Sequence, residues 1–300
     1  MDKAETSKYS ADAATSAGPE SRMSPSKPRA ASLPYVTTAD GTMLYYKDWG
    51  TGKPIVFVNS WAMNCDMWQY QMAPFVKAGY RCIGYDRRGH GRSTQPSHGY
   101  DYDTLADDLA ALMEQLDLRD ATMIGHSMGP GEIVRYIGRH GSGRVSKIVM
   151  LAPTTPFTLR TPDNPDGLPG GMFEAFRVEW LKDFPGWLAK NARPFVMPDT
   201  SDQLLQWGVN MMLQTSLIAV LECNRAVVET DFRTELPRIK VPTLIIHGTA
   251  DMSAPLELSG RRTQALIPGS KLLVYEGAPH GLMLTHIERL NADILSFIAG

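Results

Sequence analysis

The sequence of 300 residues has no long hydrophobic run and no excess of positive charge. No stretch approaches the roughly 18 apolar residues that span a bilayer, and no apolar segment follows the charged residues at the N-terminus. The formal net charge of −2 lacks the basic excess that binds a nucleic-acid backbone or an anionic membrane. We therefore expect a cytoplasmic protein that binds neither nucleic acid nor a membrane.

The sequence is also poor in cysteine, with only Cys65, Cys82 and Cys223. An odd number of widely separated cysteines argues against a disulfide framework, and none of them forms a C-x-x-C pair or a metal-ligand spacing with a histidine. Three histidines fit surface or helix-end positions and form no cluster of metal ligands, namely His98, His140 and His286. We expect a reducing compartment, no metal and no cofactor.

Composition separates a polar N-terminal segment from a longer region that is rich in apolar residues. Residues 1–33 are rich in Ser, Ala, Pro and Lys and carry few bulky apolar side chains, which predicts a flexible tail. After this tail, two β-prone runs flank Asp40-Gly41, which indicates a hairpin. The whole chain is 43% hydrophobic, enough to bury the core of one large α/β domain.

Short runs that are apolar at nearly every position predict strands covered on both faces. They occupy residues 54–58, 81–85, 121–125, 147–151, 243–248 and 271–275. Apolar residues at helical spacing predict helices over 102–116 and 287–298. Repeated strand and helix units favour a mostly parallel, twisted sheet with helices on its faces.

One connection is too long for a simple crossover between strands. Roughly 90 residues separate the runs at 147–151 and 243–248, and a structureless loop of that length is abnormal. We expect an inserted helical cap over residues 154–235, with the sheet domain formed by residues 34–153 and 236–300.

A serine lies between two glycines in Gly125-His126-Ser127-Met128-Gly129, after one predicted strand and before a segment with helical periodicity. In this context G-x-S-x-G predicts a nucleophile elbow, a sharp turn that exposes the serine hydroxyl above the sheet edge. A turn serine without catalytic function is the alternative. His126 is expected to be a packed neighbour rather than a second base.

A serine hydroxyl needs a histidine base and a carboxylate that orients the histidine, in the chain order Ser, Asp, His. Asp251 follows the strand at 243–248, and His280 follows the strand at 271–275. Because the carboxyl ends of parallel strands lie at one edge of a sheet, we expect Ser127, Asp251 and His280 to form a catalytic triad.

Five segments carry a resemblance to a known family: SWAMNCDMWQYQ, GYDRRGHGRS, GHSMG, HGTADMSAP and YEGAPHGLMLTH. They resemble the α/β-hydrolase fold and, within it, the cofactor-free bacterial haloperoxidase and arylesterase group, over about residues 35–299. The resemblance implies that Ser127 is the nucleophile, Asp251 the orienting acid and His280 the base. It also implies an oxyanion hole formed by the main-chain amides of Trp61 and Met128.

The chain departs from this group where the group usually has His-Gly-Trp-Pro and this sequence has Asn59-Ser60-Trp61-Ala62. Because the donors are main-chain amides, the hole can persist if Ser60 adopts the glycine conformation. Peracid-forming members tend to carry the proline, so its loss favours ordinary ester or lactone hydrolysis over peroxidatic chemistry.

Other polar residues fit structural positions. The segment from Asp86 to Ser93 is expected to be a buried, hydrogen-bonded turn rather than a clamp for acidic substrates. Residues near the catalytic loops are predicted to form the walls of a substrate pocket beneath the cap, namely Thr154, Phe157, Met252 and Leu282.

The sequence thus predicts a serine hydrolase for small to medium apolar carboxylic esters or lactones. Cofactor-free perhydrolysis by the same triad and a ligand receptor with slow turnover are the alternatives. Relatives that use an aspartate nucleophile are excluded, because position 127 is serine. The sequence leaves open whether the protein forms a homo-oligomer.

Overall fold

Eight strands form one sheet in the order β1-β2-β4-β3-β5-β6-β7-β8 in the computed structural model, which describes residues 33–300. The strands are β1 (Tyr35–Thr37), β2 (Met43–Trp49), β3 (Pro54–Val58), β4 (Arg81–Tyr85), β5 (Ala121–His126), β6 (Val145–Leu151), β7 (Thr243–Gly248) and β8 (Lys271–Tyr275). β2 pairs antiparallel with β1 and with β4, and all other neighbours are parallel. All six predicted strands and the hairpin are present. The flexible tail predicted at 1–33 lies outside the described residues, except for residue 33.

Helices cover both faces of the sheet, as expected for strands that are apolar on every position. The helices are α1 (Gln69–Lys77), α2 (Tyr102–Gln115), α3 (Gly129–His140), α7 (Gly260–Leu266), α8 (Leu282–Thr285) and α9 (Ile287–Ala299). Short 3-10 turns lie at Cys65–Trp68, Arg193–Phe195 and Leu236–Arg238. The predicted α/β fold with a mostly parallel sheet is confirmed.

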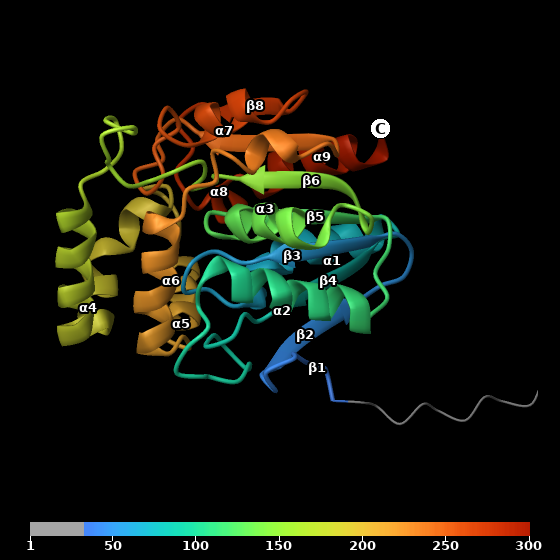
Figure 1. The fold of residues 1–300 in the computed structure, drawn as a ribbon, viewed down its shortest axis with the longest axis horizontal. Coiled ribbons are helices and arrows are strands. Elements are labelled where there is room, and N and C mark those ends of the chain that lie inside the picture. Colours follow the sequence, from blue (N-terminus) through green and yellow to red (C-terminus); the bar gives the residue numbers. More distant parts are fainter. Residues whose placement is uncertain (1–32) are drawn as a thin grey trace, which may run out of the picture. The chain divides into compact units, whose positions relative to one another are not determined.

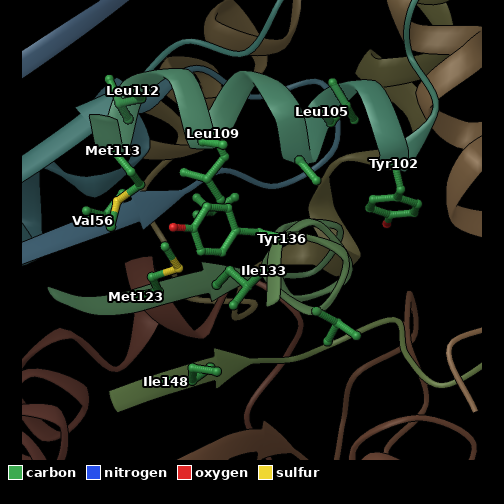
Figure 2. Packing of buried hydrophobic residues seen from close by; sticks show 14 of the residues in the cluster. Val56, Tyr102, Leu105, Leu109, Leu112, Met113, Met123, Ile133, Tyr136 and Ile148 are labelled. Atoms are coloured by element: carbon green, nitrogen blue, oxygen red, sulfur yellow. The ribbon is translucent and has the colours of Figure 1, made fainter. Parts of the chain in front are cut away.

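Alternate residues of each strand belong to two different hydrophobic clusters. Val56 and Val58 pack with α2 and α3, whereas Ile55 and Phe57 pack with α1 and α9. Figure 2 shows the first cluster, in which leucines of α2 and Tyr136 of α3 lie over the strands that carry Val56 and Met123. The period of two along a strand therefore distributes each apolar run between the two layers of helices.

Three further helices cluster at the end of the sheet to which the β6 arrow points (Figure 1). They are α4 (Gly170–Asn191), α5 (Asp202–Met212) and α6 (Leu217–Glu229). All three lie within the predicted cap, residues 154–235. Because Pro34–Gly300 form one compact unit, the boundary between cap and core stays a prediction.

Among the described residues, no single helix is long and apolar enough to cross a membrane, although α5 and α6 together meet the length and composition test across a 94° bend.

Candidate active site

Ser127 lies in the sharp turn between β5 and α3, where its φ of 58° is in the left-handed region. Both flanking glycines are required by close approaches of the main chain. A Cβ on Gly125 would lie 2.8 Å from the carbonyl carbon of Gly129, and a Cβ on Gly129 would lie 2.5 Å from the carbonyl oxygen of Val58. The G-x-S-x-G pattern therefore follows from the packing of this turn against its own helix and against β3.

His280 and Asp251 reach Ser127 from the loops that follow β8 and β7. The Ser127 Oγ lies 2.9 Å from His280 Nε2, and His280 Nδ1 lies 2.6 Å from Asp251 Oδ2. A carboxylate only accepts hydrogen bonds, so Nδ1 carries the proton and Nε2 is free to accept from the serine hydroxyl. The structure thus brings together three residues from three strand ends, and all three are buried.

Main-chain amides hold the other carboxylate oxygen of Asp251. Its Oδ1 accepts hydrogen bonds from the amides of Ser253 and Ala254 at 2.9 and 2.8 Å. Burial alone would raise the pKa of Asp251, but the positive charge that His280 has when protonated and hydrogen bonds from histidines and the Ala254 amide hold this pKa well below its usual range. The carboxylate therefore stays ionised and fixed in orientation.

The oxyanion hole assigned from the sequence stays a prediction; its two main-chain amides are those of Trp61, in the loop after β3, and of Met128, directly after Ser127. Neither amide donates a hydrogen bond to another described residue. The Trp61 side chain is anchored against α6 and α4, because its Nε1 donates to the Val220 carbonyl at 2.8 Å and its ring lies 4.7 Å from that of Trp180.

Ser60 does not adopt the left-handed conformation that favours glycine, so the condition placed on this residue is not met. The left-handed residue in this loop is Ala62, with a φ of 56°, and Ser60 has no positive φ. Proline has a fixed φ near −65°, so this backbone cannot accept the proline that the haloperoxidase pattern has at position 62. The departure in sequence therefore corresponds to a departure in backbone conformation.

A cavity of about 440 Å³ opens between Ser127 and the cap helices. Its lining is mostly apolar and includes six aromatic side chains from residues 154–235, namely Phe157, Phe173, Phe176, Trp180, Trp187 and Phe195. Arg262 is the one arginine or lysine among the lining residues, and it is paired with Asp166 at 2.7 Å. The site thus offers an apolar chamber in front of the serine hydroxyl.

Comparison with known proteins agrees with this geometry. Residues 53–204 match the family model described as alpha/beta hydrolase fold. The chain is 40% identical to the non-heme chloroperoxidase CPO-A1 of Kitasatospora aureofaciens over 273 residues, which cover 89% of this chain and 99% of that protein. The chain belongs to the α/β-hydrolase family. The predicted resemblance is confirmed.

Two more comparisons place this α/β hydrolase among esterases and haloperoxidases. It is 39% identical to the bifunctional esterase/perhydrolase DCH of Acinetobacter calcoaceticus, over 88% of this chain and 99% of that one. The crystal structure of a bromoperoxidase from Bacillus anthracis superposes with a TM-score of 0.85 at 37% identity, over 89% of this chain and 99% of that one.

One of the four residues predicted to line the pocket of the hydrolase does not line it. Thr154, Phe157 and Met252 line the cavity, but Leu282 does not. Leu282 begins α8 and is fully buried in the core beneath the sheet, and Leu284 lines the cavity in its place. Sequence distance from His280 could not show which side of this short helix faces the cavity.

His247, at the end of β7, is a site residue that sequence reasoning missed. Its Nε2 lies 2.8 Å from the Ala254 carbonyl oxygen and 3.1 Å from Asp251 Oδ2. Both neighbours are acceptors, so Nε2 carries a proton that these two oxygens share. The available signal was the position of His247 at the end of a predicted strand, four residues before Asp251.

His126 supports the main chain of His280, in agreement with its expected position as a packed neighbour. Its Nε2 donates to the His280 carbonyl oxygen at 2.9 Å, and the two rings lie 4.7 Å apart. Burial and then the nearby charge of His280 lower the pKa of His126 to about 3, so the ring stays neutral. It makes no contact with the Ser127 hydroxyl.

The segment from Asp86 to Ser93 forms the buried, hydrogen-bonded turn that the sequence predicts. Arg88 makes a two-pronged pair with Asp108, at 2.6 and 2.7 Å, and Arg92 donates to Asp86 at 2.9 Å. None of these charged groups lines the cavity, so the turn is unavailable to an acidic substrate.

Proposed function

We propose that this α/β hydrolase cleaves small to medium apolar carboxylic esters or lactones through an acyl-enzyme. Ser127 is the nucleophile, His280 the general base and acid, and Asp251 the group that orients the imidazole. The observation that carries the proposal is the continuous hydrogen-bonded path from the Ser127 hydroxyl through His280 to Asp251, located at an apolar cavity.

The reaction proceeds in two halves. In the first half, Ser127 Oγ attacks the substrate carbonyl carbon while His280 Nε2 takes the hydroxyl proton. The oxyanion accepts hydrogen bonds from the amides of Trp61 and Met128, and His280 returns the proton to the leaving alcohol. In the second half, His280 deprotonates a water that attacks the acyl carbonyl, which releases the carboxylic acid and restores the serine.

The lining of the cavity supports an apolar acyl or alcohol group. Aromatic side chains from α4 gain free energy when they cover apolar substrate surface, whereas a charged substrate would find Arg262 already neutralised by Asp166. The cavity of about 440 Å³ suits a substrate of modest size.

Perhydrolysis is the second candidate, and the 39% identity to a protein named bifunctional esterase/perhydrolase favours it. In this reaction hydrogen peroxide replaces water in the second half, and the products are a peracid and free Ser127. The peracid then oxidises bromide. Bromination of monochlorodimedone in acetate and peroxide measures this activity, and no signal at high enzyme concentration would remove the second candidate.

The decisive experiment compares Ser127→Ala with Ser270→Ala. Ser127→Ala should lose nearly all hydrolysis of p-nitrophenyl acetate and all labelling by a fluorophosphonate, with an unchanged thermal unfolding midpoint. Ser270 does not line the cavity, and its hydroxyl donates to main-chain carbonyls near α7, so Ser270→Ala should retain activity. Wild-type rates in Ser127→Ala would contradict the nucleophile assignment.

Two further measurements separate the remaining alternatives. Slow or absent labelling of the wild type by the fluorophosphonate would favour a ligand receptor over an enzyme. A panel of esters and lactones with graded acyl length, run with and without peroxide, reports the reaction type and the size limit of the cavity together.

A further inference from the structure

The buried guanidinium of Arg87 is bonded to the main chain of the loop that carries Trp61. Arg87 follows β4 and is only 1% exposed. Its Nη2 donates to the Asn59 carbonyl oxygen at 3.0 Å, and its Nη1 donates to the Ser60 carbonyl oxygen at 3.3 Å. Two adjacent carbonyls of one loop are thus held by one rigid, planar cation.

Glu132 holds the other side of the same guanidinium. Arg87 Nε donates to Glu132 Oε2 at 2.8 Å, and the Tyr85 hydroxyl donates to Oε1. Glu132 is fully buried in the first turn of α3, the helix that begins two residues after Ser127. The ion pair therefore connects the nucleophile helix to the loop after β3.

The carbonyl that Arg87 holds and the amide of Trp61 belong to one peptide group. Because a peptide group is planar and trans, the direction of the Ser60 carbonyl fixes the direction of the Trp61 N–H. A cation on the carbonyl oxygen also polarises the peptide and strengthens the amide as a donor. Rotation of this peptide would break the bond to Arg87.

The geometry points to Arg87 as a positioning residue that, together with Glu132, sets the direction of the Trp61 amide relative to the Met128 amide across the oxyanion hole. The pair links the two loops that supply these donors. The tight approach of Gly129 to the Val58 carbonyl brings the same two segments together at a second point. This inference rests on the proposed function.

A stabilising effect alone does not account for this pair. Desolvation of two charges offsets most of their attraction, so a buried ion pair is weak evidence for stability. Arg88 and Asp108 provide a matched comparison, because they form an equally buried pair one residue further along the turn. Within residues 33–300, the guanidinium of Arg88 hydrogen-bonds to the carboxylates of Asp108 and Asp40 and not to residues 59–61.

The test compares two double variants that each remove both charges of one pair. Arg87→Met with Glu132→Gln removes the donors to the loop and keeps an acceptor for the Tyr85 hydroxyl, whereas Arg88→Met with Asp108→Asn is the control. We expect the first to lower kcat for p-nitrophenyl acetate by about 10- to 100-fold, part of the effect of losing one oxyanion donor. KM should change by less than about twofold, because the donors act mainly in the transition state.

Inhibition by a trifluoromethyl ketone provides a readout that a structural effect would not move. The ketone forms a tetrahedral oxyanion on Ser127, so its inhibition constant should rise by about the same factor as kcat falls. The control pair should leave kcat and this constant within about threefold of the wild type. Arg87→Lys keeps a cation for Glu132 without the planar fork and should be intermediate.

Three outcomes would overturn the inference: an equal loss of kcat in both double variants, unchanged kcat in the Arg87 variants, or a loss confined to KM. If the Arg87 and Glu132 double variant does not fold, Arg87→Lys decides by the same criteria. Ser127→Ala is assayed in parallel. Activity in that variant would refute the proposed function, whereas its inactivity with an unaffected Arg87 variant would refute only the present inference.

Discussion

Replacing Asp251 by asparagine should inactivate the enzyme by inverting the tautomer of His280. Asp251 Oδ1 accepts from two main-chain amides, which can only donate. The oxygen of an asparagine at this position must therefore occupy the Oδ1 site, so its NH₂ group faces His280 Nδ1, which lies 2.6 Å from Oδ2. The imidazole then has to present Nδ1 as an acceptor and carry its proton on Nε2.

In that tautomer Nε2–H points at Ser127 Oγ, 2.9 Å away, and no base is left for the hydroxyl proton. The same tautomer inversion in a serine-histidine-aspartate triad lowers kcat by about 10⁴-fold, or about 5 kcal/mol of transition-state stabilisation. His247 does not restore the original tautomer of His280, because its Nε2–H can keep its hydrogen bond to the Ala254 carbonyl oxygen.

The assay is the steady-state hydrolysis of p-nitrophenyl acetate, corrected for spontaneous hydrolysis, with thermal unfolding of each variant as a check on folding. Asp293→Asn is the matched control, because Asp293 accepts from the Tyr275 hydroxyl at 2.5 Å and does not line the cavity. The control should retain its rate. A folded Asp251→Asn variant with more than a tenth of the wild-type kcat would refute this account of how Asp251 acts.

Two further predictions concern stability. A Cβ at Gly129 would lie 2.5 Å from the Val58 carbonyl oxygen, so Gly129→Ala should lower the free energy of unfolding, measured in urea, by about 1–3 kcal/mol. A Cβ at Gly143 would have nothing within 4 Å, so Gly143→Ala should change this free energy by less than about 0.5 kcal/mol. Equal effects of the two substitutions would contradict the packing argument. Burial lowers the pKa of both His90 and His126 to about 3, so the unfolded chain binds more protons between pH 6.5 and 3. Stability should therefore fall as pH decreases through this window, by up to about 1.4 kcal/mol per pH unit for each histidine, and urea unfolding at pH 7.5 and 5 that shows equal stability would refute this.

The fold was predictable because each strand carries its own signal. Runs such as residues 54–58 are apolar at every position, which occurs where helices cover both faces of a sheet. The strand ends were harder to predict: β6 begins at Val145, two residues before the predicted run at 147–151, because Ser146 interrupts the apolar pattern although its main chain continues the strand. Hydrogen bonding to the neighbouring strand decides such boundaries, and local composition does not record this pairing.

The site was predictable only where its chemistry requires a particular residue in a particular order. Ser127, Asp251 and His280 stand at strand ends in the expected sequence, so topology alone brings them to one edge of the sheet. His247 and Arg87 act through atoms that are close only in the folded chain. The sequence alone does not distinguish a buried histidine or arginine that supports a catalytic group from one that only fills the core.

Backbone strain shows why the supporting groups are needed. Ala62, Ser127 and Ala152 follow the adjacent strands β3, β5 and β6, and each has a positive φ of 43–58° without being glycine. Such conformations cost on the order of 1–3 kcal/mol each and persist only where neighbouring contacts hold them. The Thr215 hydroxyl donates to the Ala62 carbonyl at 2.9 Å, and the Arg87 guanidinium donates to the carbonyls of Asn59 and Ser60 in the same loop. The loop after β3 is thus fixed by Thr215 on one side and by the buried ion pair on the other, so that neither contact alone should preserve its geometry.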